Sequence, residues 1–404
     1  MVGCASPGEA SLPVLLWIHG GSQAVSFGNS ATGLCEPTRL VKRSVETSQP
    51  IIVVTINYRL NIFAFGDLES DRNLALKDQQ RAIEFVRAHI AGFGGDPNRI
   101  TIAGESAGAV FCHALLVMGS PVDSCILQSG TLGLSPPQPR PVAENLINRL
   151  SDDLQAHGEN DLRSAAVPVL LAAQDRLGMH SFYLQDDESL QGWKNAPFCE
   201  RLLIGDTEFE AVLWRNGIES CAPAIICDAF AILGPESQRV KGLYGIVPDR
   251  PVSCKLGALD FLNDVRFSLP IERALLLQRG HKEDSKVFRY VLDQPNPWQA
   301  SSRAHHGVDL VYLFGGYDMS HSKPAQEVSR VMQDKWIEFI SGRDPWSPGS
   351  AFAFGPFGVC APLDAEQLAV RRRNDHLVAL AGMGDAVLEQ AVGQLGRGRS
   401  SLFN

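Results

Sequence analysis

The sequence lacks the features that would place a protein in a membrane or on a polyanion. Its apolar runs fall well short of the roughly 20 residues that a membrane-spanning helix needs. It has no run of basic residues, and its net charge of −9 disfavours binding to nucleic acid. Residues 1–10 lack the basic and apolar segments of a secretory signal, and no Asn-x-Ser/Thr glycosylation site occurs. These absences predict an intracellular protein that neither spans a membrane nor binds nucleic acid.

Metal-binding motifs are absent too. The nine cysteines are scattered without the short paired spacings typical of zinc sites. Most are expected to be small, buried apolar residues. Cys221 and Cys227 are close enough in sequence to close a small loop under oxidising conditions. We therefore expect neither a metal ion nor a cofactor.

The composition is that of an ordinary globular protein. The 404 residues are 45% hydrophobic and 20% charged, which supplies enough apolar material for a large core. Strands are expected at residues 14–18, 51–56, 100–105, 125–130, 200–205 and 287–292. Helical patterns lie between several of them, and this order predicts an α/β fold with right-handed crossovers and a mostly parallel central sheet.

The second half of the chain is less regular, and a proline-rich stretch at residues 134–140 opens it. We expect one domain whose helical insertions form a cap over an edge of the sheet. Its predicted parts are a core at about residues 12–134 and 198–346, cap and insertion helices at about 141–195 and 211–280, and a C-terminal helix at about 375–392.

The most informative stretch is residues 100–109, where a β-branched run meets Gly104-Glu-Ser106-Ala-Gly108 and a helical pattern follows. A strand that turns sharply into a helix leaves no room for a Cβ atom two residues before or after the turn. The spacing therefore predicts a nucleophile elbow, in which the hydroxyl of Ser106 projects beside the N–H of Ala107 at the start of the helix.

A serine hydroxyl is a weak nucleophile at neutral pH, so Ser106 needs a base and a carboxylate that orients the base. The best candidates for the base are His305 and His306, which stand in a loop before an apolar segment, with Gly307 allowing the chain to turn. His113 falls on the elbow helix and is expected to pack there.

The acid is expected at the end of another strand. Asp206, Glu208 and Glu210 lie together just after the strand at residues 200–205. Two of the three must be ordinary solvated residues, and composition alone does not choose among them.

Six segments follow one another in an order that resembles a known family. They are Trp17-Ile-His-Gly-Gly21, Asn57-Tyr-Arg59, Ala91-Gly-Phe-Gly-Gly-Asp-Pro97, Gly104-Glu-Ser-Ala-Gly108, Leu127-Gln-Ser-Gly130 and His306-Gly-x-Asp309. The chain resembles the type-B carboxylesterases, which are cholinesterase-like α/β-hydrolases, and it is most similar to their fungal members over roughly residues 12–346. The resemblance implies an α/β-hydrolase fold and a serine esterase that forms an acyl-enzyme from a small to medium ester or lactone.

Carried over position by position, the resemblance implies that Ser106 is the nucleophile and His306 the general base. It assigns the acid to Glu210. The family's glutamate lies five residues after the glycine that ends the corresponding strand, and in this sequence that glycine is Gly205. The oxyanion hole would consist of three backbone N–H groups, those of Gly21, Ser22 and Ala107.

Two further assignments rest on the same resemblance. Glu105 resembles the family's second buried glutamate, which supports the developing imidazolium, although a purely structural hydrogen bond beneath the elbow is an equal interpretation. Arg59 and Asp78 resemble a buried ion pair of the scaffold.

The chain departs from the family pattern at two places. Ser22 replaces the usual third glycine and adds a side chain near the acyl pocket. The sequence also begins just before the first oxyanion strand, so the family's N-terminal β-rich segment is expected to be missing, with less cover for one sheet edge. The alternative function is a non-catalytic, cholinesterase-like binding protein or an inactive truncated product. Acyl and alcohol preference and oligomeric state stay open.

Overall fold

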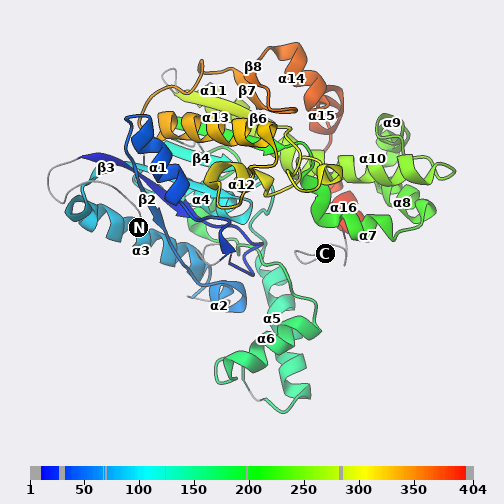
Figure 1. Cartoon of the computed structure of the whole chain (residues 1–404). Helices are drawn as coiled ribbons and strands as arrows, with labels where there is room; N and C mark the ends of the chain where they lie inside the picture. The colour runs from blue at the N-terminus through cyan, green and yellow to red at the C-terminus, as the bar shows by residue number, and fades with distance from the viewer. Residues whose placement is uncertain are drawn as a thin grey trace.

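The computed structural model describes residues 11–26, 32–66, 68, 71–122, 124–159, 161–196, 199–281 and 285–396. Within them, one eight-stranded sheet has the order β2-β1-β3-β4-β5-β6-β7-β8 (Figure 1). Strands β1 to β7 pair in parallel, and β8 pairs antiparallel with β7. The strands are β1 Leu12–Ile18, β2 Ile52–Thr55, β3 Gly95–Glu105, β4 Ser124–Gln128, β5 Arg201–Thr207, β6 Lys286–Leu292, β7 Ala351–Phe354 and β8 Cys360–Leu363.

The strands are apolar on both sides because both faces of the sheet are covered. In β1, Val14 and Leu16 pack into one hydrophobic cluster, while Leu15 and Trp17 pack into another on the opposite face. Such continuous apolar runs are characteristic of parallel sheets buried between helices. The α/β fold predicted from the sequence is confirmed.

Helices cover the two faces of the sheet in two groups (Figure 1). One cluster contains residues of α3 Leu74–His89, α4 Ala107–Val117 and α11 Leu269–His281. The other contains residues of α1 Thr38–Glu46, α12 Val308–Phe314 and α13 Lys323–Ile340. Residues 269–280, predicted as part of the cap, thus pack as α11 against β5 and β6.

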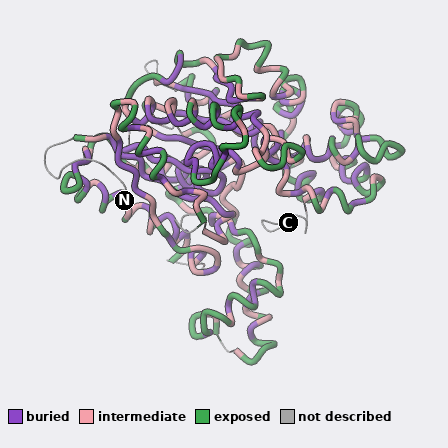
Figure 2. The backbone as a smooth tube through the Cα atoms, in the orientation of Figure 1, coloured by how far each residue is buried: buried purple, intermediate pink, exposed green. Residues whose placement is uncertain are grey.

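Two helical lobes extend beyond the sheet, and their outer surfaces are largely exposed (Figure 2). One lobe packs α2 Asn61–Phe65 with α5 Arg140–Ala156 and α6 Val167–Arg176 around its own hydrophobic cluster. The other is built from α7 Arg215–Glu219, α8 Pro223–Ala229, α9 Ser237–Leu243, α10 Pro251–Asn263, α15 Asn374–Ala381 and α16 Asp385–Gly396. We call the second one the cap lobe.

The C-terminal region is richer than the sequence indicates. The predicted helix at residues 375–392 is two helices, α15 and α16, because Gly382 and Gly384 lie between them. The short strands β7 and β8 and helix α14 Ala365–Arg371 were not predicted. Strands of four residues and a helix of seven residues are too short to show a clear periodic pattern in the sequence.

The suggested disulfide between Cys221 and Cys227, which would close a small loop, is not formed in this structure. Both thiols are free, and Cys227 Sγ instead lies 4.0 Å from Cys254 Sγ, between α8 and α10. Among the described helices, none combines the length and the apolar character needed to cross a bilayer.

Candidate active site

The nucleophile elbow forms where β3 meets α4. Ser106 has φ 56° and ψ −123°, a conformation that is rare for a residue with a side chain. A Cβ atom on Gly104 would lie 2.4 Å from the carbonyl carbon of Gly108, and one on Gly108 would lie 2.1 Å from the oxygen of Ile18. The backbone crowding explains both glycines. It holds the serine in its strained conformation.

The loop after β1 packs directly on this elbow. A Cβ on Gly20 would lie 2.6 Å from the carbonyl oxygen of Glu105, and Gly21 has φ 117°, which favours glycine. Tyr58 fixes the loop from β2, because its hydroxyl donates to the carbonyl oxygen of His19 at 2.5 Å and its ring stacks on the imidazole. The Asn57-Tyr-Arg59 segment thereby supports the loop that the sequence predicts as an oxyanion hole.

The three predicted oxyanion donors lie around the elbow. Ala107 is the first residue of α4, so its N–H has no intrahelical acceptor. Within the described residues, no hydrogen bond is assigned to the N–H groups of Gly21 and Ser22. The carbonyl oxygen of Ser22 accepts a hydrogen bond from Phe182 N–H at 2.9 Å, which ties the loop to a distant segment.

The Arg59–Asp78 ion pair is present, with 2.6 Å between Nη2 and Oδ1. It is not buried as the resemblance implied, since the side chains are 46% and 28% exposed. An ion pair so open to solvent contributes little to stability.

His306 and Glu210 come together at the carboxyl ends of the strands. His306 Nδ1 lies 2.5 Å from Glu210 Oε2, and the Glu210 side chain is fully buried. The other carboxylate oxygen of Glu210 accepts from Thr207 N–H at 2.7 Å, which fixes the turn after β5. His306 N–H donates to the carbonyl oxygen of Phe209 at 3.2 Å, so the histidine loop is attached to the glutamate turn.

The alternative acids and the neighbouring histidine have other partners. Asp206 is fully buried and pairs with Arg372 at 2.8 Å, so the expectation that both alternatives are solvated is wrong for Asp206. Glu208 pairs with Arg303 at 2.8 Å. His305 Nε2 lies 2.9 Å from the side-chain nitrogen of Asn296. Of the candidates left open by the sequence, the structure joins His306 with Glu210.

Glu105 faces the other nitrogen of the same imidazole. Its Oε1 lies 3.2 Å from His306 Nε2, and both side chains are buried. In the part of the chain that the structure describes, no hydrogen bond joins the Ser106 hydroxyl to His306. Catalytic hydrogen bonds are often loose without substrate and tighten in the complex.

The carboxylates around His306 change its ionisation. Burial lowers the pKa of His306, but the charges of Glu105 and Glu210 outweigh burial and raise it above its ordinary value of 6.5. Burial raises the pKa of Glu105 as well, and the charge of His306 opposes that rise. The two carboxylates therefore favour the protonated form of His306.

Asp309, the last residue of the His306 motif, lies beneath the imidazole loop. Gln128 Nε2 donates to Asp309 Oδ2 at 2.7 Å, and Trp336 Nε1 donates to Gln128 Oε1 at 3.0 Å. This buried chain of hydrogen bonds fixes the start of α12 against β4 and α13.

Sequence reasoning missed two residues of the cap lobe that touch the site. Asn263 Oδ1 accepts a hydrogen bond from Glu210 N–H at 2.7 Å. The ring of Phe267 packs against the imidazole of His306, with centroids 5.3 Å apart. Both belong to the end of α10 and the π-helical turn η6 Asp264–Ser268. No local motif marks them.

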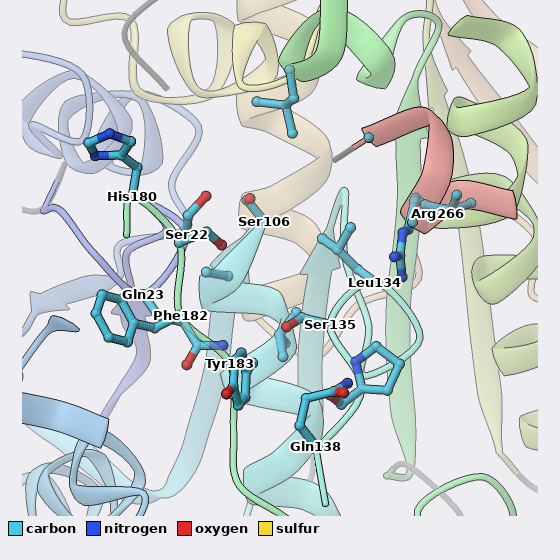
Figure 3. Close-up of a pocket in the computed structure, with 18 of the residues that line it drawn as sticks. Ser22, Gln23, Ser106, Leu134, Ser135, Gln138, His180, Phe182, Tyr183 and Arg266 are labelled. Atoms are coloured by element: carbon cyan, nitrogen blue, oxygen red, sulfur yellow. The ribbon is translucent and has the colours of Figure 1, made fainter. Parts of the chain in front are cut away.

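A cavity of about 500 Å³ opens above Ser106 (Figure 3). Ser106, Ala107 and Ser22 form part of its lining, and His180 and Phe182 stand on one side. Further lining comes from residues 134–138, from α4 and α5, and from the cap lobe, including its helix α16. Among the described residues, no group of three or more His, Cys, Asp or Glu side chains is arranged to hold a metal ion.

The elbow, the flanking helices and the parallel sheet define an α/β-hydrolase. The model of the carboxylesterase family matches residues 4–192 and 240–370. The chain therefore belongs to the carboxylesterase family, whose members include carboxylic ester hydrolases, and the resemblance drawn from the six segments is confirmed.

Individual relatives agree with this assignment. Lipase 1 of Yarrowia lipolytica is 32% identical over 84% of this chain and 70% of the lipase. The para-nitrobenzyl esterase of Bacillus subtilis is 28% identical over 83% of this chain and 72% of the esterase. An inactive carboxylesterase-like protein of Byssochlamys spectabilis is 41% identical, but over 30% of this chain and 22% of its own length.

Solved structures show the same fold. A carboxylesterase of Geobacillus stearothermophilus superposes with a TM-score of 0.72, covering 91% of this chain and 83% of the carboxylesterase, at 23% sequence identity. A para-nitrobenzyl esterase superposes with a TM-score of 0.69, covering 90% of this chain and 80% of that esterase.

Proposed function

We propose that the protein hydrolyses carboxylic esters through a triad of Ser106, His306 and Glu210. One observation carries the proposal. The imidazole of His306 is held by Glu210 at 2.5 Å on the same rim of the sheet where the elbow presents Ser106. A buried carboxylate in this position fixes the imidazole tautomer, leaving Nε2 as the base.

In the first half of the reaction, His306 Nε2 takes the proton of the Ser106 hydroxyl as its oxygen attacks the ester carbonyl. The N–H groups of Gly21, Ser22 and Ala107 bind the oxyanion of the tetrahedral intermediate. Each such donor contributes about 3 to 4 kcal/mol in comparable enzymes. The protonated imidazole then donates its proton to the departing alcohol, leaving Ser106 acylated.

In the second half, His306 deprotonates a water molecule that attacks the acyl-enzyme, and Ser106 regains its proton when the carboxylic acid leaves. The negative charge of Glu105, close to Nε2, stabilises the imidazolium present in both halves. The cavity of about 500 Å³ suits a small to medium ester.

The sharpest test is labelling with a fluorophosphonate, which reacts only with an activated serine. Intact-mass and peptide analysis should show one adduct on Ser106, and Ser106→Ala should show none. Denatured protein provides the control for nonspecific labelling. An absent adduct on folded protein that melts cooperatively would refute the esterase proposal.

That outcome would favour a second candidate, a non-catalytic binding protein of the same fold. Two observations support it: one relative is named inactive, and the described residues show no hydrogen bond between Ser106 and His306. A chain without a cooperative melting transition would instead be an inactive product whose triad is not assembled.

A further inference from the structure

We infer that the cavity above Ser106 is built for neutral esters that carry an additional carbonyl or hydroxyl oxygen, which Arg266 binds. The inference rests on the proposed function and names the substrate class of that site. It comes from the wall of the cavity, not from the triad.

Polar side chains form a substantial part of the wall, beside apolar ones. Apart from Ser22 and Ser106, the polar side chains that contribute to it are Gln23, Ser135, Gln138, His180, Ser181, Tyr183, Arg266 and Glu389. A plain alkyl group placed against them would remove water without replacing the hydrogen bonds that the water made, which costs free energy. An oxygen-bearing substrate would replace those bonds.

Arg266 is the strongest donor in this wall. It lies in η6, one residue before the Phe267 that packs on His306, and its side chain is 17% exposed. Nη1 donates to Glu389 Oε1 at 3.0 Å, while no hydrogen bond is assigned to Nε or Nη2 within the described residues. A guanidinium carries five N–H donors, so several stay available for a ligand.

The position of Arg266 sets where the substrate oxygen should be. Figure 3 shows Arg266 on the side of the cavity away from His180 and Phe182, with Ser106 between them. The oxygen that it binds therefore belongs to the body of the ester and not to the scissile carbonyl, which the oxyanion donors hold.

The ion pair with Glu389 favours a neutral oxygen over a carboxylate. Glu389 cancels the charge of Arg266, and a substrate carboxylate would lie close to the glutamate and meet like-charge repulsion. A ketone or hydroxyl oxygen accepts a hydrogen bond from the guanidinium without that repulsion.

The test uses three esters of similar length. They are p-nitrophenyl heptanoate, p-nitrophenyl 6-oxoheptanoate, which differs by one carbonyl oxygen, and the anionic mono-p-nitrophenyl ester of adipic acid. We expect kcat/KM for the oxo ester to exceed that for heptanoate about tenfold, as for one charge-assisted hydrogen bond. The adipate ester should be slower than the oxo ester.

The variant Arg266→Met removes the donors and keeps the length of the side chain. It should reduce the ratio of kcat/KM between oxo ester and heptanoate to about one. Arg273→Met is the matched control, because Arg273 also holds α16 by one ion pair, to Asp385 at 2.8 Å, but contributes nothing to the cavity lining. This control should keep the tenfold ratio.

The outcomes separate the two proposals. Hydrolysis of heptanoate at the same rate as the oxo ester overturns the inference and leaves the esterase proposal standing. A ratio that persists in Arg266→Met, or a fastest rate with the adipate ester, also overturns it. No hydrolysis of any ester by folded protein overturns the esterase proposal and this inference with it.

Discussion

The floor and the walls of the cavity are built in different ways. The floor, around Ser106, lies at the ends of parallel strands, where close backbone contacts fix each position. A Cβ on Gly108, for example, would lie 2.1 Å from a carbonyl oxygen. Much of the walls comes from helices outside the sheet, and a Cβ on Gly393 in α16 would meet no atom within 4 Å.

This difference separates chemistry from substrate choice. Groups that must meet a transition state gain from rigid placement, because small displacements cost much of the rate. Groups that only surround a substrate tolerate change, so the walls can vary while the reaction stays the same.

The largest contrast is expected between Ser106 and a wall residue. Ser106→Ala should lower kcat by about 10⁵-fold or more, since the nucleophile is lost. Val142→Ala in α5 should change kcat/KM less than about tenfold, because Val142 lines the cavity, is 41% exposed and makes only apolar contact with the substrate. Steady-state hydrolysis of p-nitrophenyl butyrate measures both, and unchanged thermal melts serve as the control. Substantial turnover by Ser106→Ala would remove the distinction.

Stability should show the same contrast. Gly108→Ala should lower the free energy of unfolding by about 2 to 3 kcal/mol, because the new methyl group meets backbone atoms that cannot move away. At Gly393→Ala in α16 the new methyl group meets no atom within 4 Å, and the change should raise the free energy of unfolding by about 0.5 kcal/mol. Urea titrations followed by circular dichroism give both values. Equal effects of the two changes would contradict the contrast in packing.

Asn263 tests whether the cap lobe contributes to chemistry as well as to substrate choice. Asn263→Ala leaves the buried N–H of Glu210 without its acceptor. We expect the activation free energy to rise by about 1.4 kcal/mol, which lowers kcat about tenfold. Asn263→Asp keeps an oxygen at this place and should retain more of the activity. If the two variants were equally impaired, the hydrogen bond would not be the reason.

The smallest expected effect is that of replacing Glu105, and it concerns the pH dependence of kcat/KM. His306 acts as a base only when its imidazole is neutral. Because the pKa of His306 is raised, the neutral form appears at higher pH, and kcat/KM should still increase with pH above 6.5. Glu105→Gln removes one of the two charges that raise this pKa, and the rising limb should move to lower pH by roughly one unit. Plots of kcat/KM against pH test this shift, and an unmoved limb would show that Glu105 does not act on His306.

The floor was accessible to sequence reasoning because its constraints are local. Glycines two residues either side of Ser106 record backbone crowding within a single turn, and Gly307 marks the turn after His306. The position just after a strand reduced the candidates for the catalytic acid to three carboxylates. Choosing Glu210 among them needed the family's spacing. In the structure the Glu210 side chain accepts a hydrogen bond from Thr207 N–H, while the side chains of Glu208 and Asp206 pair with arginines.

The walls were not accessible because their contacts join distant parts of the chain. Arg266 pairs with Glu389 across 123 residues, and Phe182 binds the oxyanion loop at Ser22. Neither pair leaves a repeat, a spacing or a composition that a single sequence reveals. The break between α15 and α16 is different, because Gly382 and Gly384 mark it locally and the prediction of one helix overlooked them.

The place of α16 has a practical consequence for anyone who shortens the protein. Val392, Gly393 and Gly396 line the cavity, so a deletion that reaches this helix would remove part of the cavity wall.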